Sequence, residues 1–87
     1  MKHEDKIAAI RTVLLESWDP VGVNDVPAAQ DEYDSYLPSI LQLLERHVSV
    51  ADLARHLTDI TARDMGLVAV AQRDLAVAER LLRLRLR

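Results

Sequence analysis

Residues 18–36, WDPVGVNDVPAAQDEYDSY, separate two stretches of helical sequence and so set the architecture of the chain. The segment holds the only Trp, both Tyr, two of the three Pro and one of the two Gly. Pro20 disfavours helical geometry in the residue before it, so a preceding helix has to end near Asp19. Pro38 is tolerated only in the first turn of the next helix, where its missing N–H costs nothing. We therefore expect a loop over residues 17–34 with a helix on each side.

Apolar residues recur every three or four positions in four stretches, which is the spacing of one face of an α-helix. The stretches predict helices over residues 4–16, 35–46, 50–64 and 69–86. Ser35 is expected to cap the second helix, and Ser49 to cap the third in a capping-box arrangement with Asp52. Gly66 is placed to supply the left-handed residue that ends the third helix. Two apolar rows in the last stretch predict a helix that is largely packed.

The composition also favours helices. Apolar residues make up 49% of the 87 residues and aromatic residues only 3%, which suits helices better than a β-sandwich. At this length the chain forms one domain, so we predict an all-α, compact single-domain bundle of about four helices with one longer loop. The absence of Cys fits a reducing compartment, and the longest uncharged apolar run, residues 65–71, cannot span a bilayer. We expect a cytoplasmic protein without a membrane span.

Charge is distributed unevenly along the chain. The net charge is −3, yet residues 12–45 contain no Lys or Arg. That stretch carries seven acidic residues, which are Glu16, Asp19, Asp25, Asp31, Glu32, Asp34 and Glu45. Such a stretch is either an anionic binding surface or a region that other parts of the chain neutralise.

Three short segments resemble the signature of a known family. They are WDPVGV at residues 18–23, DEYD at residues 31–34 and MGL at residues 65–67. Together they resemble a family of small helical bacterial proteins with a W-D-P-(I/V)-G and D-E-Y signature, over roughly residues 7–82. The resemblance implies a single-domain helical fold and a bacterial source, and it brings no activity, cofactor or catalytic residue. The chain also looks like the small acidic proteins encoded beside secreted toxins as antidotes, a similarity of type and not of motif.

The aromatic residues of the central segment allow two interpretations. Trp18 and Tyr33 could be exposed anchors for a partner, because aromatic residues dominate interface hot spots. Trp18, directly after the first helix, is better explained as part of the core with its indole N–H bonded locally. Asp19, Pro20 and Gly22 are interpreted as turn residues, with the Asp19 side chain accepting a backbone N–H and Gly22 at positive φ.

The acidic and histidine residues give weak signals for chemistry. The acids of residues 31–34 could bind a hard cation, but they lack the D-x-D-x-D-G pattern of a calcium loop. His56 shares a predicted helix face with Asp52 and Asp59, which is typical of a solvated surface group more than of a zinc site. No Ser-His-Asp arrangement or glycine-rich phosphate loop occurs in the sequence. We therefore predict no catalytic residue, no metal site, no cofactor and no enzymatic activity.

The last predicted helix carries a basic ridge, which consists of Arg73, Arg80, Arg83 and Arg87 at spacings that share one helical face. Such a ridge could contact phosphates. However, the chain is acidic overall and its C-terminal half has no aromatic residue to stack on bases, so nucleic acid is disfavoured. The favoured interpretation is that the basic ridge lies against the acidic stretch, within one fold or across a homodimer.

These observations favour a non-enzymatic protein-binding module. Its acidic face would bind a protein with a basic surface, and an antidote that neutralises a basic toxin domain is the most concrete version. The face consists of Asp25, Asp31, Glu32 and Asp34, flanked by Tyr33 and Tyr36. Two alternatives stay open: a regulatory nucleic-acid binder that uses the basic ridge, and a carboxylate metal-binding protein.

Overall fold

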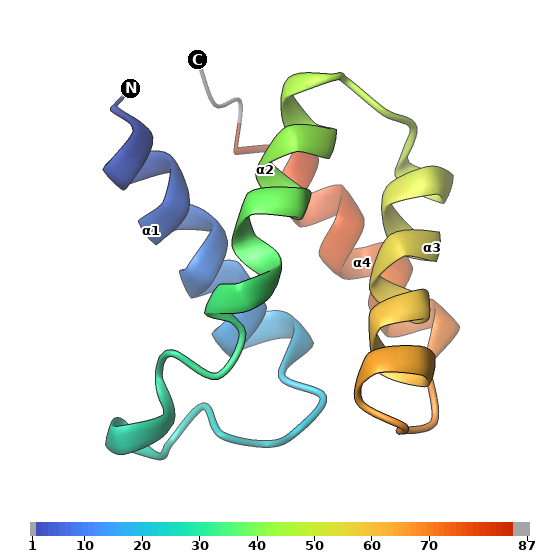
Figure 1. Ribbon diagram of the computed structural model, residues 1–87. Helices are drawn as coiled ribbons and strands as arrows, with labels where there is room; N and C mark the ends of the chain where they lie inside the picture. The colour runs from blue at the N-terminus through green and yellow to red at the C-terminus, as the bar shows by residue number, and fades with distance from the viewer. Residues whose placement is uncertain (1, 85–87) are drawn as a thin grey trace.

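The computed structural model describes residues 2–84, which contain four α-helices and no strand (Figure 1). The helices are α1 (His3–Val13), α2 (Leu37–Glu45), α3 (Val50–Asp59) and α4 (Ala71–Leu82). Figure 1 shows α1 beside α2 and α4 behind α3, and it places the α1–α2 loop and the α3–α4 loop at the same end of the molecule. The predicted all-α bundle is confirmed, although α4 begins two residues later than expected and ends at Leu82.

Helices α1 and α3 both finish in a π-helical turn. The turn Leu14–Trp18 extends α1, and its last bond runs from the Asp19 N–H to the Leu14 carbonyl at 2.8 Å. The turn Ile60–Asp64 extends α3, and the Met65 N–H donates to the Ile60 carbonyl at 3.1 Å. A left-handed residue follows each turn, Asp19 with φ of 36° and Gly66 with φ of 65°. The third helix ends at Asp64 as predicted, whereas the first continues two residues past the predicted end at residue 16, to Trp18.

Helix α2 starts later than the sequence predicts. A 3-10 turn over Asp34–Tyr36 precedes it, and Tyr36 occupies the N-cap position without a side-chain cap. The prediction that Ser35 caps this helix is wrong. With the start at Leu37, Pro38 falls in the first two helical positions, where its missing N–H would have no helical partner anyway. By contrast, Ser49 caps α3 as predicted and accepts the Asp52 N–H at 3.1 Å.

The core is built from one face of each helix. Its buried apolar side chains are Ile10, Val13, Leu14, Leu15, Trp18, Tyr33, Leu37, Ile40, Leu41, Leu44, Leu53, Ala54, Leu57, Ile60, Val77, Ala78 and Leu81. Helix α3 packs most extensively against α4, and α1 packs against α2. The π turn after α1 touches α4, so the buried Trp18 links the end of α1 to the start of α4.

Helix α4 is packed on one face only. The buried residues are Asp74, Val77, Ala78 and Leu81, at spacings of three, one and three. Leu75 stays 42% exposed, so the prediction that α4 is largely packed is wrong. The reason is that α4 contacts α3 and the α1 region on one side and has no helix of residues 2–84 on the other. Among residues 2–84, no helix combines the length and the apolar character that crossing a bilayer requires.

Candidate functional site: an acidic cavity between two loops

The loop after α1 is organised by the carboxylate of Asp19. One oxygen accepts the Val23 N–H and the Tyr33 hydroxyl, each at 2.8 Å, and the other accepts the Asn24 N–H at 3.1 Å. Gly22 has φ of 79°, as expected for a residue that reverses the chain here. Burial raises the pKa of Asp19, but the hydrogen bonds that the carboxylate accepts outweigh burial, so this pKa is lowered overall. The predicted turn chemistry of Asp19 and Gly22 is confirmed.

Asp19→Asn is expected to weaken the fold at neutral pH and to reduce its sensitivity to acid. The neutral amide would place its NH2 group where the second carboxylate oxygen now accepts the Asn24 N–H. The loss of this hydrogen bond should lower the free energy of unfolding by about 1–3 kcal/mol. Because the pKa of Asp19 is lowered from its ordinary value of 3.8, the ionised carboxylate stabilises the fold above that pH. This contribution is lost as the pH falls through the folded-state pKa. Urea unfolding of wild type, Asp19→Asn and the exposed-site control Asp25→Asn across the acid range tests this. Equal acid sensitivity in all three would contradict it.

The rest of the loop is held by one amide side chain. Gln30 Nε2 lies 3.3, 3.1 and 3.0 Å from the carbonyl oxygens of Val23, Asn24 and Val26, and its two N–H groups are shared among these three acceptors. A short 3-10 turn, Pro27–Ala29, lies between these carbonyl groups and Gln30 in the sequence. Residues 24–28 are all exposed, so they project from a loop whose two ends are fixed.

Three aromatic rings lie beneath the loop. The Trp18 ring centroid is 5.3 Å from that of Tyr33 at a tilt of 56°, and 6.4 Å from that of Tyr36 in an edge-to-face arrangement. Trp18 is buried, as predicted. Tyr33 is also buried, with 1% of its surface exposed, so the prediction that its ring flanks an exposed face is wrong. Burial, together with the hydrogen bond to the Asp19 carboxylate, raises the pKa of Tyr33. Tyr36 stays half-buried.

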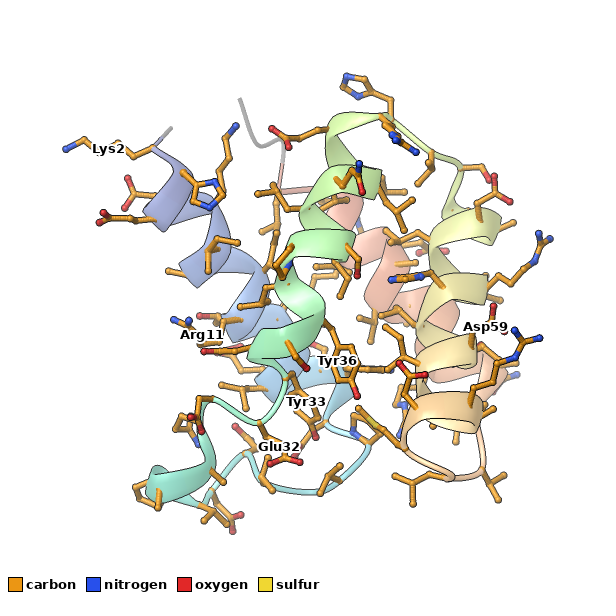
Figure 2. The ribbon with its side chains drawn as sticks, in the orientation of Figure 1. Lys2, Arg11, Glu32, Tyr33, Tyr36 and Asp59 are labelled. Atoms are coloured by element: carbon orange, nitrogen blue, oxygen red, sulfur yellow. The ribbon has the colours of Figure 1, made fainter. Side chains whose placement is uncertain are left out.

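The predicted acidic face separates into one paired and three unpaired carboxylates. Asp34 accepts two hydrogen bonds from the Arg11 guanidinium, at 2.8 and 3.0 Å. The pKa of Arg11 is raised, chiefly by the hydrogen bond to Asp34, with a smaller contribution from the charge of Asp31. Asp25, Asp31 and Glu32 are exposed, and no cationic group of residues 2–84 lies within 4.0 Å of them. Figure 2 places Glu32 next to Tyr33 and Tyr36, below the start of α2.

The basic ridge of α4 neutralises little of this face. Arg80 reaches Glu16 at 3.1 Å and also hydrogen-bonds Ser17. Arg83 lies 3.6 Å from Glu79 on its own helix, and Arg87 lies outside the described residues. The prediction that the ridge lies against the acidic stretch therefore holds for the pair Arg80–Glu16, and none of the acidic-face residues pairs with the described part of the ridge.

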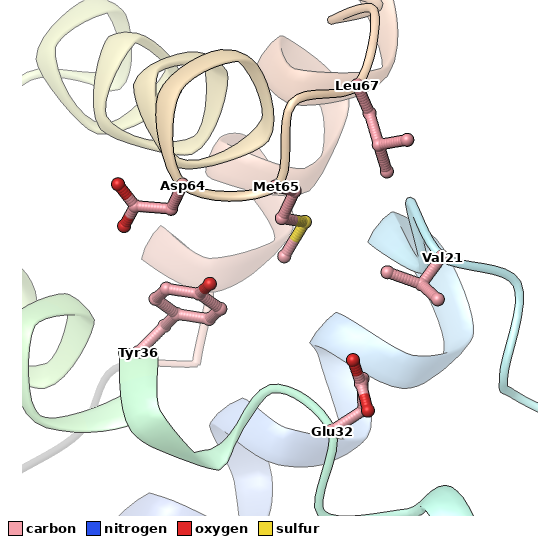
Figure 3. A pocket seen from close by; sticks show the side chains of 6 residues that line it. All are labelled: Val21, Glu32, Tyr36, Asp64, Met65 and Leu67. Carbon is pink, nitrogen blue, oxygen red and sulfur yellow. The ribbon is translucent and has the colours of Figure 1, made fainter.

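A cavity of about 390 Å³ opens between the two long loops (Figure 3). Its lining residues are Val21 and Glu32 from the first loop, Tyr36 from the start of α2, and Asp64, Met65 and Leu67 from the end of α3 and the second loop. In Figure 3 the Met65 side chain lies at the centre, with Glu32 and Asp64 on different sides. The cavity thus brings together all three segments that carry the family resemblance. Asp64 is the functional candidate that sequence analysis missed.

A buried polar cluster lies behind the aromatic rings. Asp74 is 1% exposed and accepts the Trp18 indole N–H at 3.1 Å and the Thr58 hydroxyl at 2.7 Å. Arg73 Nε lies 3.8 Å from the same carboxylate, too far for a hydrogen bond. Two nitrogens of Arg73 are buried without a hydrogen-bond partner among residues 2–84. Asp74 therefore connects α4 to α3 and to the end of α1.

His56 lies between α2 and α3, not on an open helix surface as predicted. Its Nε2 is 3.0 Å from the Ser39 hydroxyl, which itself donates to the Tyr36 carbonyl at 3.0 Å. Burial lowers the pKa of His56, and the charges of Asp59 and Asp64 oppose this only in part. The neutral imidazole therefore stabilises the fold above its ordinary pKa of 6.5, and this contribution declines on acidification. Within residues 2–84 no group of three or more metal-ligating side chains converges.

Comparison of the chain with models of protein families, with curated proteins and with solved structures finds no match. The family resemblance of the three short segments therefore stays a prediction, and the function has to be argued from the site itself.

Proposed function

We propose that this chain is a non-enzymatic binding module whose acidic face recognises a protein with a basic surface. The observation that carries the proposal is the state of Asp25, Asp31 and Glu32. They are exposed, and no described cation neutralises them, whereas Glu16, Asp34 and Glu45 each have an ion-pair partner. The loop that carries them is fixed by Asp19 and Gln30. A charged surface held in a defined position favours specific recognition.

Electrostatic complementarity would act mainly on the encounter between the two proteins. Like charges on one face attract a basic partner from a distance and repel acidic competitors. An antidote that neutralises a basic toxin domain in the cytoplasm is one concrete form of this proposal, and the absence of Cys is compatible with that compartment. We propose neither a catalytic activity nor a cofactor for this chain.

Reversing two charges tests the face directly. The variant Asp25→Lys, Asp31→Lys is expected to lower the association rate with a basic partner by about tenfold or more at low salt. Partners are captured from the source organism with immobilised protein, identified by mass spectrometry, and then measured in purified form by stopped-flow association. The control Glu4→Lys, Asp5→Lys changes the net charge equally, on exposed residues in the first turn of α1. Identical rates for both variants would contradict the proposal.

The nucleic-acid alternative receives less support from the described residues. Arg80 is engaged by Glu16 and Ser17, and Arg83 by Glu79. Arg73 is partly buried beside Asp74. A phosphate-binding ridge would need these guanidinium groups to be available, and a shift assay at low salt would reveal such binding.

A further inference from the structure

We propose that the cavity between the two loops receives an arginine side chain of the basic partner. This inference rests on the proposed function and extends it, because it names the group that anchors the partner. The cavity volume of about 390 Å³ lies within the range of about 300–1,000 Å³ that is typical of small-ligand sites. One long side chain therefore fits, and a folded domain does not.

The charges of the cavity select a cation. Glu32 contributes a carboxylate from the first loop and Asp64 one from the π turn that ends α3, and neither has a cationic group of residues 2–84 within 4.0 Å. An anionic ligand would meet two like charges here. A purely apolar ligand would displace water from the carboxylates without replacing its hydrogen bonds, which is unfavourable. Both charges favour a guanidinium or ammonium group over these alternatives.

The remaining walls select a long and partly apolar side chain. Val21, Met65 and Leu67 offer apolar surface on which the methylene groups of the ligand can pack. Tyr36 adds an aromatic ring whose orientation is fixed by its edge-to-face contact with Trp18. A cation over such a ring gains about 0.5–1 kcal/mol at an exposed site.

Arginine fits this combination better than lysine. Its guanidinium is planar, stacks on aromatic rings, holds water weakly and donates hydrogen bonds in two directions. Two carboxylates on different sides of one cavity match that distribution of donors (Figure 3). Asp64 ends the π turn after α3 and Glu32 precedes α2, so a bound arginine would connect the end of α3 to the first loop.

Met65 provides a direct reporter, because the chain has only two methionines. The protein is labelled with ¹³C at the methionine methyl groups, and the Met65 signal is assigned with Met65→Leu. The probe is N-acetyl-arginine methylamide, and N-acetyl-citrulline methylamide is its uncharged counterpart. We expect a saturable shift of the Met65 signal by the arginine probe, with a dissociation constant on the order of millimolar. Binding of the citrulline probe should be weaker by about fivefold or more.

Matched variants locate the binding energy. Glu32→Gln and Asp64→Asn should each weaken arginine binding by about threefold or more, because each removes one charge at the ligand. Asp5→Asn removes the same charge from an exposed position in the first turn of α1, outside both the cavity and the acidic face, and should leave binding of the arginine probe unchanged. Backbone amide spectra of all three variants verify that they are folded.

The outcomes separate the cavity from the acidic face. A Met65 signal that does not respond, or that responds equally to both probes, overturns the arginine assignment. If the charge reversal at Asp25 and Asp31 still slows association, the proposed function survives that failure. Conversely, arginine binding that depends on Glu32 and Asp64 supports the cavity assignment even if the double reversal leaves partner association unchanged.

Discussion

Asp74→Ala is expected to destabilise the protein by about 3–5 kcal/mol, the usual effect of removing one partner from a buried charged network. The Trp18 indole N–H and the Thr58 hydroxyl would lose their acceptor, and the Arg73 guanidinium would lose the nearest opposite charge. Native domains have a free energy of unfolding of about 5–15 kcal/mol, so this single change would remove a large share of it. Urea unfolding followed by circular dichroism measures the effect.

Two control measurements show whether the effect of Asp74→Ala comes from its buried hydrogen bonds. Glu79→Ala removes a carboxylate from the exposed side of the same helix, where its pair with Arg83 contributes at most about 0.5 kcal/mol. Asp74→Ala should also cost less in a Trp18→Phe background, by about 1 kcal/mol, because the indole donor is already absent there. If Asp74→Ala and Glu79→Ala had equal effects, Asp74 would not be the link between α4 and the end of α1.

Trp18→Ala is expected to cost about 3–5 kcal/mol, as other truncations of buried large aromatic residues do. Trp18 is 1% exposed, contacts both tyrosine rings and donates to Asp74. Its removal would open a void between the end of α1, the start of α2 and the start of α4. The variant has no tryptophan, so its unfolding in urea is followed by far-UV circular dichroism.

A substitution at an exposed position serves as the control for Trp18→Ala. Val68 is 89% exposed, and Val68→Ala should change stability by no more than about 0.5 kcal/mol. Trp18→Phe should fall between the two, because it keeps an aromatic ring and loses the indole donor. A Trp18→Ala variant as stable as Val68→Ala would show that the aromatic cluster does not support the fold.

The fold was predictable wherever local chemistry decides it. Pro20 and Asp19 indicate the end of α1, Ser49 indicates the start of α3, and Gly66 indicates its end. These signals act within a few residues of the position they determine. The start of α2 was misplaced because Pro38 fits two neighbouring positions in a first turn, and the choice between Ser35 and Tyr36 as cap depends on the 3-10 turn before it.

The site was predictable only in part, because its contacts join residues distant in sequence. The acids of the first loop were identified by charge alone, but the pairing of Asp34 with Arg11 spans 23 residues. Trp18 and Asp74 are 56 residues apart. One signal was present: Asp74 shares a helical face with Val77, Ala78 and Leu81, so its position on that face indicates burial. Asp64 had no comparable signal, since only the meeting of the two loops gives it a role.

In the first loop, the residues that hold the loop in place differ from those exposed to a partner. Asp19 and Gln30 hold the frame, whereas residues 24–28 project into solvent and contribute nothing to the core. Substitutions within residues 24–28 can therefore change the charge and shape of the exposed segment at little thermodynamic cost to the helices. The sequence of this short segment can therefore vary, in evolution or in design, while the helical scaffold stays constant.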